Sequence, residues 1–209
     1  MISADQALRR LEEGNRRFAA DRPSAETVER RVHRVGLAES QEPFAVILGC
    51  SDSRVPVEIV FDQGLGDLFV IRVAGNIVAP SQIGSVEFAA EAFGTRLVVV
   101  LGHSRCGAIR ATLDALLQPA TTHSLNLRAI VDRIRPSVEG LLATELRHDR
   151  AALEREAGRA NVRATVDHLR HGSAMIEHLI ERGGMKVVGA EYSLETGVVE
   201  FLEPAARGG

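Results

Sequence analysis

Four short apolar runs alternate with segments of helical spacing along the chain. These runs are rich in β-branched residues and almost continuously hydrophobic, and they occupy residues 43–49, 67–75, 95–102 and 185–192. Such a composition predicts strands that are covered on both faces, as the strands of parallel sheets are. Helical spacing follows the second run over 81–94 and the third over 106–117. The alternation therefore predicts an α/β fold in which helices flank a mostly parallel central β-sheet.

The first residues carry the pattern of an N-terminal helix. Ser3 and Gln6 stand at the spacing of a capping box. A thin apolar stripe follows, formed by Leu8, Leu11 and Phe18. Because so narrow a stripe gains little when a helix packs alone, we expect residues 1–22 to form a helical arm that packs on a second copy of the chain.

The C-terminal part is also helical in pattern before it returns to the sheet. Residues 124–182 predict helices, with a break at Pro136 and an end at Gly183 and Gly184. The closing residues 193–202 predict a turn followed by an edge strand. Neither a repeat nor a long linker divides the chain, so we expect one domain over residues 1–209.

Composition narrows the class of protein. Of the 209 residues, 45% are hydrophobic and 25% are charged, as in ordinary soluble globular proteins. A net charge of -3 with mixed signs, and the absence of Trp, give no electrostatic or stacking basis for binding nucleic acid. No apolar run reaches the ~20 residues that span a bilayer, and the first residues lack an apolar export segment. We therefore expect a cytoplasmic protein without a membrane partner, whose cysteines stay reduced.

Both cysteines of the chain stand where a predicted strand ends or a helix begins. Cys50 follows the first apolar run, His103 follows the third, and Cys106 comes three residues after His103. Because the carboxyl ends of parallel strands meet at one edge of a sheet, these side chains can share a site. Three ligands that include two thiolates suit a catalytic zinc ion, which keeps its fourth position for water.

Two other interpretations of these residues stay open. One is a pair of buried cysteines beside a hydrogen-bonded histidine, with no metal. The other is a closed zinc site that uses a further histidine. The remaining histidines lie in polar or helical stretches, where we expect them to be solvated or packed, at positions 33, 123, 148, 168, 171 and 178.

Asp52 and Arg54 add acid–base chemistry to the same loop. A residue two positions after a metal ligand can point back toward the metal, and an arginine two positions further can hold its carboxylate in a bidentate pair. Such a carboxylate would orient a nucleophile at the open metal position. The alternative is an aspartate that caps a helix and an arginine on the surface.

At this point the sequence resembles the β-class carbonic anhydrases. The segments "GCSDSRVP" at 49–56 and "GHSRCGA" at 102–108 are similar to the zinc motifs of that family in order and spacing. The similarity extends over nearly the whole chain, through "EEGNRRF", "DLFVIRVAGN", "GSVEF" and "VVGAEYSLETGVVEF".

The resemblance implies an activity and a cofactor. One Zn²⁺ per chain would be bound by Cys50, His103 and Cys106, with Asp52 and Arg54 as a catalytic dyad. The implied reaction is the reversible hydration of carbon dioxide to bicarbonate and a proton by zinc-bound hydroxide. Because two thiolates offset the charge of zinc, its acidification of water should be weaker, so we expect the rate to rise toward alkaline pH.

The resemblance also implies substrate contacts and an oligomer. Gln41 matches a glutamine that donates to a substrate oxygen across a dimer, Phe69 and Phe88 match apolar pocket positions, and Gly107 would leave a backbone N–H near the zinc. Without the resemblance, Gln41 would be interpreted as a surface amide and the phenylalanines as core. A homodimer is the implied minimum, and two dimers often form a tetramer.

One position departs from a subgroup of the family. Ile47 stands where members inhibited by bicarbonate carry a Trp that helps to form a second bicarbonate pocket, although Arg72 and Tyr192 match the rest of that pocket. We therefore expect the other subgroup, in which Asp52 pairs with Arg54 and the zinc stays open to water.

Three other functions compete with this one. A hydrolase of carbonyl sulfide or carbon disulfide would share the fold, the zinc and the dyad. A non-catalytic protein that binds zinc or senses bicarbonate would be expected to lack a ligand or a dyad residue, and the chain lacks none. A redox role is disfavoured because Cys50 and Cys106 do not form a C-x-x-C pair.

Overall fold

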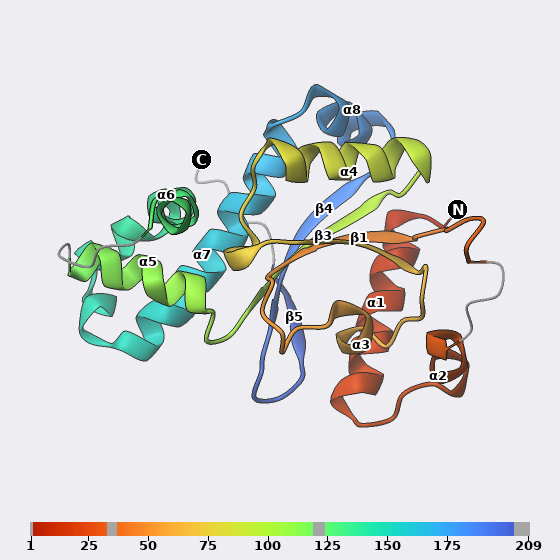
Figure 1. Cartoon of the computed structure of the whole chain (residues 1–209), viewed down its shortest axis with the longest axis horizontal. Coiled ribbons are helices and arrows are strands. Elements are labelled where there is room, and N and C mark those ends of the chain that lie inside the picture. The colour runs from red at the N-terminus through yellow and green to blue at the C-terminus, as the bar shows by residue number, and fades with distance from the viewer. Residues whose placement is uncertain (1, 33–36, 119–123, 203–209) are drawn as a thin grey trace.

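A sheet with the strand order β2-β1-β3-β4-β5 forms the centre of the computed structural model, which describes residues 2–32, 37–118 and 124–202 (Figure 1). Its strands are β1 (Ala45–Gly49), β2 (Leu68–Arg72), β3 (Leu97–His103), β4 (Lys186–Tyr192) and β5 (Val199–Leu202). The first four run parallel, and β5 pairs antiparallel with β4. The predicted α/β fold with a mostly parallel sheet and a C-terminal edge strand is confirmed.

Helices cover both faces of this sheet and extend beyond its edge. They are α1 (Ala4–Ala19), α2 (Ala25–Val32), α3 (Val57–Val60), α4 (Pro80–Ala92), α5 (Gly107–Leu117), α6 (Leu125–Val138), α7 (Arg150–His171) and α8 (Ala174–Arg182), with short 3-10 turns η1 (Ala74–Asn76), η2 (Glu139–Ala143) and η3 (Glu145–His148). Within the described part of the chain, none of these helices combines the length and apolar character that crossing a membrane requires.

The side chains of β1 show how the two faces differ. Ala45 and Ile47 pack against α1 and α3, whereas Val46 and Leu48 pack against α4, α7 and α8. A third apolar cluster lies beyond the carboxyl ends of the strands, where α5 and α6 pack against the start of α7. Figure 1 shows this helical part to one side of the sheet. The carboxyl ends of the strands therefore face a layer of helices, and this layer buries that edge of the sheet.

The N-terminal helix begins as predicted but packs differently. Ser3 and Gln6 form the capping box. Leu11 is fully buried against the sheet of the same chain, and Leu8 and Phe18 pack partly against that cluster. The narrow stripe therefore finds its partner within the chain, and our reason for placing the helix on a second copy was wrong. A contact of its outer side with another subunit stays a prediction.

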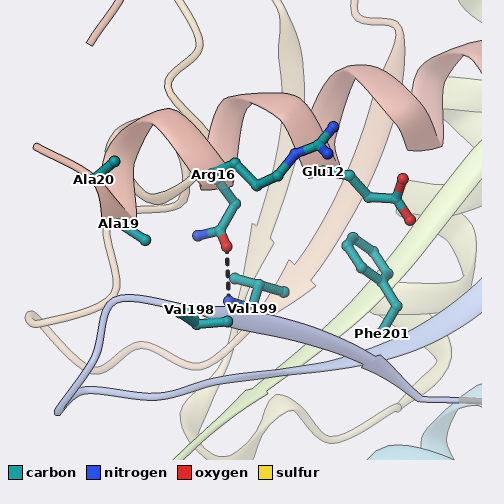
Figure 2. A pocket seen from close by; sticks show the side chains of 8 residues that line it. Glu12, Arg16, Ala19, Ala20, Val198, Val199 and Phe201 are labelled. Carbon is teal, nitrogen blue, oxygen red and sulfur yellow. Dashed lines mark hydrogen bonds between the residues drawn. The ribbon is translucent and has the colours of Figure 1, made fainter. Parts of the chain in front are cut away.

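Helix α1 also approaches the edge strand β5. A shallow cavity of about 580 Å³ lies between them, with Arg16, Val198 and Phe201 in its wall (Figure 2). Across this junction the Val199 N–H donates to the Asn15 Oδ1 over 2.8 Å (Figure 2). The buried Asn15 amide donates in turn to two backbone carbonyls, so this contact serves packing.

Two predicted boundaries were wrong. The run predicted as a strand over 67–75 ends at Arg72, because Gly75 and Asn76 adopt positive φ and form a turn. The break expected at Pro136 comes only after Val138: the proline lies inside the last turn of α6, and the 3-10 turn η2 begins at Glu139, three residues later. The helix end expected at Gly183 and Gly184 is confirmed, since α8 ends at Arg182 with Gly183 as its C-cap.

Candidate metal centre

Three predicted ligands come together at the carboxyl edge of the sheet. Cys50 directly follows β1, His103 is the last residue of the adjacent β3, and Cys106 is the N-cap of α5. All three are buried, and their candidate ligand atoms lie within 4.8 Å of one another. The two sulfur atoms are 4.0 Å apart. The topology thus produces the convergence that the positions of these residues predicted.

The imidazole of His103 is oriented for binding. Its Nδ1 lies 2.9 Å from the Ser104 carbonyl oxygen. Because a carbonyl only accepts, this nitrogen must carry the proton, which leaves a lone pair on Nε2. Within the described residues, Nε2 is buried and has no hydrogen-bond partner. Burying such an atom is costly unless something binds it, and imidazole with two sulfur ligands is a donor set that zinc accepts.

The two thiols differ in their electrostatics. The pKa of Cys50 is lowered, mainly by the hydrogen bond from Cys106 and also by that from the Gly75 N–H, whose nitrogen is 3.4 Å from the sulfur. The pKa of Cys106 is raised because its proton is shared with the Cys50 thiolate and its sulfur is buried. Of the two thiols, Cys50 is therefore the one whose ionisation is favoured, and binding of a cation by both sulfur atoms would release their thiol protons.

Asp52 faces this group and is fixed by Arg54. The arginine Nε donates to Oδ1 over 2.9 Å and its Nη2 donates to Oδ2 over 2.7 Å. These hydrogen bonds hold the pKa of Asp52 well below its usual range, so the carboxylate is ionised. Its Oδ2 lies 3.9 Å from the His103 Nε2. The alternative was a helix-capping aspartate with a surface arginine; Arg54 is exposed as that alternative expects, but its side chain holds the Asp52 carboxylate in a bidentate pair.

Arg72 has a role that the sequence analysis missed. Its Nε donates to the Cys50 carbonyl over 3.0 Å, and its Nη2 donates to the Asp52 carbonyl over 2.6 Å. The guanidinium thus fixes the backbone on which both Cys50 and Asp52 stand. A partial signal existed, because Arg72 pairs with Gly49 in the parallel register and so ends beside this loop.

The predicted substrate residues are placed unequally. Gly107 begins α5 directly after Cys106, and a Cβ built there meets no atom within 4 Å. Phe69 and Phe88 instead pack with Phe93 between β2 and α4, with ring centroids 5.7 to 6.1 Å apart. Phe88 is 55% exposed, and Gln41 is exposed. Within the described residues, the ring partners of Phe69 and Phe88 are each other and Phe93, and not members of the Cys50–His103–Cys106 group.

The closed zinc site gains no support. Four of the remaining histidines are exposed and lie outside the ligand group, namely His148, His168, His171 and His178. His33 and His123 lie outside the described residues.

A cavity of about 700 Å³ borders the group between α5, α7 and the hairpin of β4 and β5, with His103 and Cys106 in its wall. Asp52 and Arg54 do not line it. Its charged side chains include ion pairs such as Arg105 with Glu195 at 2.6 Å and Arg159 with Glu191 at 2.8 Å. This cavity therefore borders the ligand group but does not include the Asp52–Arg54 dyad.

Comparison with known proteins agrees with this geometry. The family model described as carbonic anhydrase matches residues 45–199. Carbonic anhydrase 2 of Mycobacterium tuberculosis is 42% identical over 193 residues, which cover 91% of this chain and 89% of that protein. A β-carbonic anhydrase structure from Aspergillus fumigatus shares 25% identity with a TM-score of 0.73, covering 97% of this chain and 91% of that one.

A second similar solved structure is of proteins that form tetramers. It describes tetrameric β-carbonic anhydrases from Sordaria macrospora, with 26% identity and a TM-score of 0.69 over 79% of this chain and 83% of that one. The family match runs from the first residue of β1 to the first residue of β5, and so includes every residue of the ligand group and the dyad. This chain belongs to the β-carbonic anhydrase family, whose members are lyases.

Proposed function

We propose that this chain catalyses the reversible hydration of carbon dioxide to bicarbonate and a proton, with one Zn²⁺ held by Cys50, His103 and Cys106. One observation carries the proposal. A buried imidazole nitrogen without a hydrogen-bond partner and two sulfur atoms converge within 4.8 Å, and the ionised carboxylate of Asp52 faces them. That arrangement fits a metal with an open position better than it fits a packed core.

The residues around the metal have separable roles. Zinc, when bound, lowers the pKa of water and so supplies a nucleophile near neutral pH. Asp52, ionised and facing the ligand group, would accept a hydrogen bond from a nucleophile generated there and so orient it toward the substrate. Arg54 keeps Asp52 ionised and in place through its two side-chain hydrogen bonds. Arg72 holds the loop through the Cys50 and Asp52 carbonyls.

The substrate contacts belong to the same proposal. Gly107 N–H would bind a substrate oxygen near the ligand group. Phe69 and Phe88 would supply an apolar surface, which suits a neutral linear molecule. Gln41 would donate to substrate from a second subunit, so the active unit would be a dimer at least. The tetrameric relatives from Sordaria macrospora support an oligomer. The cytoplasmic location stays a prediction from the sequence.

The test is stopped-flow hydration of carbon dioxide with zinc content determined on the same preparation. Asp52→Ala should reduce kcat by about 10²-fold or more and keep about one zinc per chain, because general acid–base and positioning groups contribute on that order. Asp132→Ala is the matched control, since that aspartate lies on exposed α6 surface and forms only a long ion pair with Arg135.

The outcomes separate the competing functions. Wild-type protein with zinc but no hydration above buffer would contradict the proposal. Turnover of carbonyl sulfide by that same protein would then identify the hydrolase alternative. Equal losses in Asp52→Ala and Asp132→Ala would contradict the role of Asp52.

A further inference from the structure

Two buried polar side chains of α7 hold the turn beside the ligand group. Asn161 is 3% exposed, and its Nδ2 donates to the Gly75 carbonyl over 2.8 Å. Thr165, one helical turn later, is 5% exposed, and its Oγ1 donates to the Asn76 carbonyl over 3.3 Å. Both hydrogen bonds end on η1, the turn over residues 74–76 that connects β2 to α4.

The backbone of this turn needs external support. Gly75 has a φ of 70° and Asn76 a φ of 43°, so two successive residues adopt the left-handed region. For a residue other than glycine this conformation costs on the order of 1 kcal/mol or more, and it persists only where the surroundings fix it. The two hydrogen bonds from α7 supply that support.

The same turn contacts a proposed metal ligand. The Gly75 N–H donates to the Cys50 Sγ over 3.4 Å. Gly75 is therefore held on both sides, by its carbonyl on Asn161 and by its N–H on the sulfur. The N–H and the carbonyl of Gly75 belong to adjacent peptide units that meet at its Cα, so the Asn161 hydrogen bond restrains the backbone next to this donor.

Helix α7 packs closely on β3, the strand that ends with the proposed ligand His103. A Cβ at Gly102 would lie 2.6 Å from Val162, and a Cβ at Gly189 would lie 2.8 Å from the same side chain. Val162 thus occupies a hollow formed by glycines of β3 and β4. Gly102 immediately precedes His103, and Val162 immediately follows Asn161. The packing of Val162 on Gly102 therefore fixes the position of Asn161 relative to β3.

We propose that Asn161, assisted by Thr165, is a positioning residue for the Cys50 thiolate. It acts through the backbone on either side of the Gly75 Cα and touches neither substrate nor metal. An N–H donor on a thiolate withdraws electron density and fixes the direction of the sulfur, so its loss should change the bond between sulfur and metal without removing a ligand. This inference rests on the proposed function, because it requires that Cys50 binds the metal.

The experiment uses the full chain loaded with Co²⁺ in place of zinc, together with competition against a chelator for Zn²⁺. In Asn161→Leu, which removes the amide at similar volume, we expect the thiolate-to-cobalt absorption band to move to lower energy. We also expect affinity for Zn²⁺ to fall about 10-fold, as is usual when a partner of a metal ligand is lost.

Asn15→Leu is the matched control. Asn15 is 4% exposed and also donates to backbone carbonyls from a helix, but it lies at the junction of α1 and β5, where it accepts from the Val199 N–H. It forms three hydrogen bonds, so its loss should destabilise the fold at least as much as that of Asn161. The control should nevertheless keep the wild-type band and the wild-type affinity for Zn²⁺.

The outcomes distinguish this inference from the proposed function. A band in Asn161→Leu identical to that of the wild type, or an equal shift in Asn15→Leu, would overturn the role of Asn161. A wild-type chain without any thiolate-to-cobalt band would overturn the proposed metal site and this inference with it. If Asn161→Leu does not fold, Thr165→Val should show a smaller shift in the same direction, and an unchanged band there would count against the proposal.

Discussion

At the scale of single residues, the Asp52 carboxylate is held by donors from one neighbour. The backbone N–H and the Nε of Arg54 both donate to Oδ1, and Nη2 donates to Oδ2. The backbone hydrogen bond would remain if the Arg54 side chain were replaced, whereas the two hydrogen bonds from the guanidinium (the guanidinium fork) would be lost. The contribution of this fork can therefore be measured separately from the presence of the carboxylate.

We expect Arg54→Lys to lower kcat for carbon dioxide hydration by about 10-fold, since an ammonium cannot make the bidentate pair that orients Asp52. Zinc content should stay unchanged, because Arg54 is not one of the proposed ligands and its side-chain hydrogen bonds go to Asp52. Stopped-flow rates and metal analysis on one preparation measure both quantities.

Arg105→Lys is the control for that variant. Arg105 lies in the same segment as the ligands, but its ion pair with Glu195 is exposed, and such pairs contribute little. A loss of zinc in Arg54→Lys, or the same loss of rate in both variants, would contradict the expectation.

These contacts also show which site residues a sequence can reveal. The three proposed ligands, Cys50, His103 and Cys106, lie at or just after the ends of predicted strands. The dyad residues Asp52 and Arg54 interact within one loop. The local sequence pattern was therefore sufficient to predict that these residues share a site. Arg72 and Asn161 were missed for a physical reason. Both bind backbone carbonyls, which every residue carries, and Asn161 is separated by 86 positions from Gly75. Only the fold could identify their partners.

At the scale of elements, helix α7 can pack closely on the sheet because two strand positions that face it are glycines. Gly102 of β3 and Gly189 of β4 leave the space that Val162 fills. Because Val162 is branched at Cβ, it has few rotamers with which to avoid an added methyl group. The distance between helix and sheet beside His103 is therefore set by this contact.

Gly102→Ala should lower the free energy of unfolding by about 1–3 kcal/mol, because the added methyl overpacks a tight contact. Urea unfolding of reduced, metal-free protein measures this effect without a contribution from metal binding. Gly84→Ala is the matched control on α4, where an added Cβ meets nothing within 4 Å. That change should stabilise the protein by about 0.5–1 kcal/mol, since glycine is a poor helix residue.

The double variant Gly102→Ala/Val162→Ala tests the cause. If the two side chains collide, the double variant should be more stable than the sum of the single changes implies, by about 1 kcal/mol or more. Additive effects would mean that Gly102→Ala acts through something other than Val162.

Among the elements, pattern predicted the strands and most helices, and it failed where tertiary contacts decide. The run over 67–75 stays apolar through Val73 and Ala74, yet the chain turns there because α7 supplies partners for a left-handed backbone. The stripe of α1 is thin, but small residues such as Ala4 and Ala7 let the helix approach its own sheet closely. Neither contact is visible in the local sequence.

At the scale of the whole molecule, the chain holds the ligand group and the dyad but leaves other parts of the proposed site unassembled. Phe88 and Gln41 are exposed, and within the described residues the ring partners of Phe88 are Phe69 and Phe93 rather than members of the ligand group. If these residues act in catalysis, a second subunit must bring them to a neighbouring site. The expected dimer is then a requirement of the chemistry.

Mixed dimers test this requirement. Asp52→Ala removes the carboxylate of a site, and Gln41→Ala should remove its substrate donor, each with a loss of about 10²-fold or more. If Gln41 acts across a symmetric dimer, a mixed dimer contains one site that lacks both groups and one that is complete. Equal amounts of the two variants, dissociated and reassembled together, should then recover about a quarter of the wild-type rate, because about half of the dimers are mixed.

The same mixture gives a different result if Gln41 serves its own subunit. Each site of a mixed dimer would then lack one group, and the rate would stay near that of the two parent variants. The control is the same procedure applied to wild-type protein, which measures how much activity survives reassembly. A chain that sediments as a monomer while hydrating carbon dioxide would also contradict the requirement, because the ligand group and the dyad of one subunit would then suffice for catalysis.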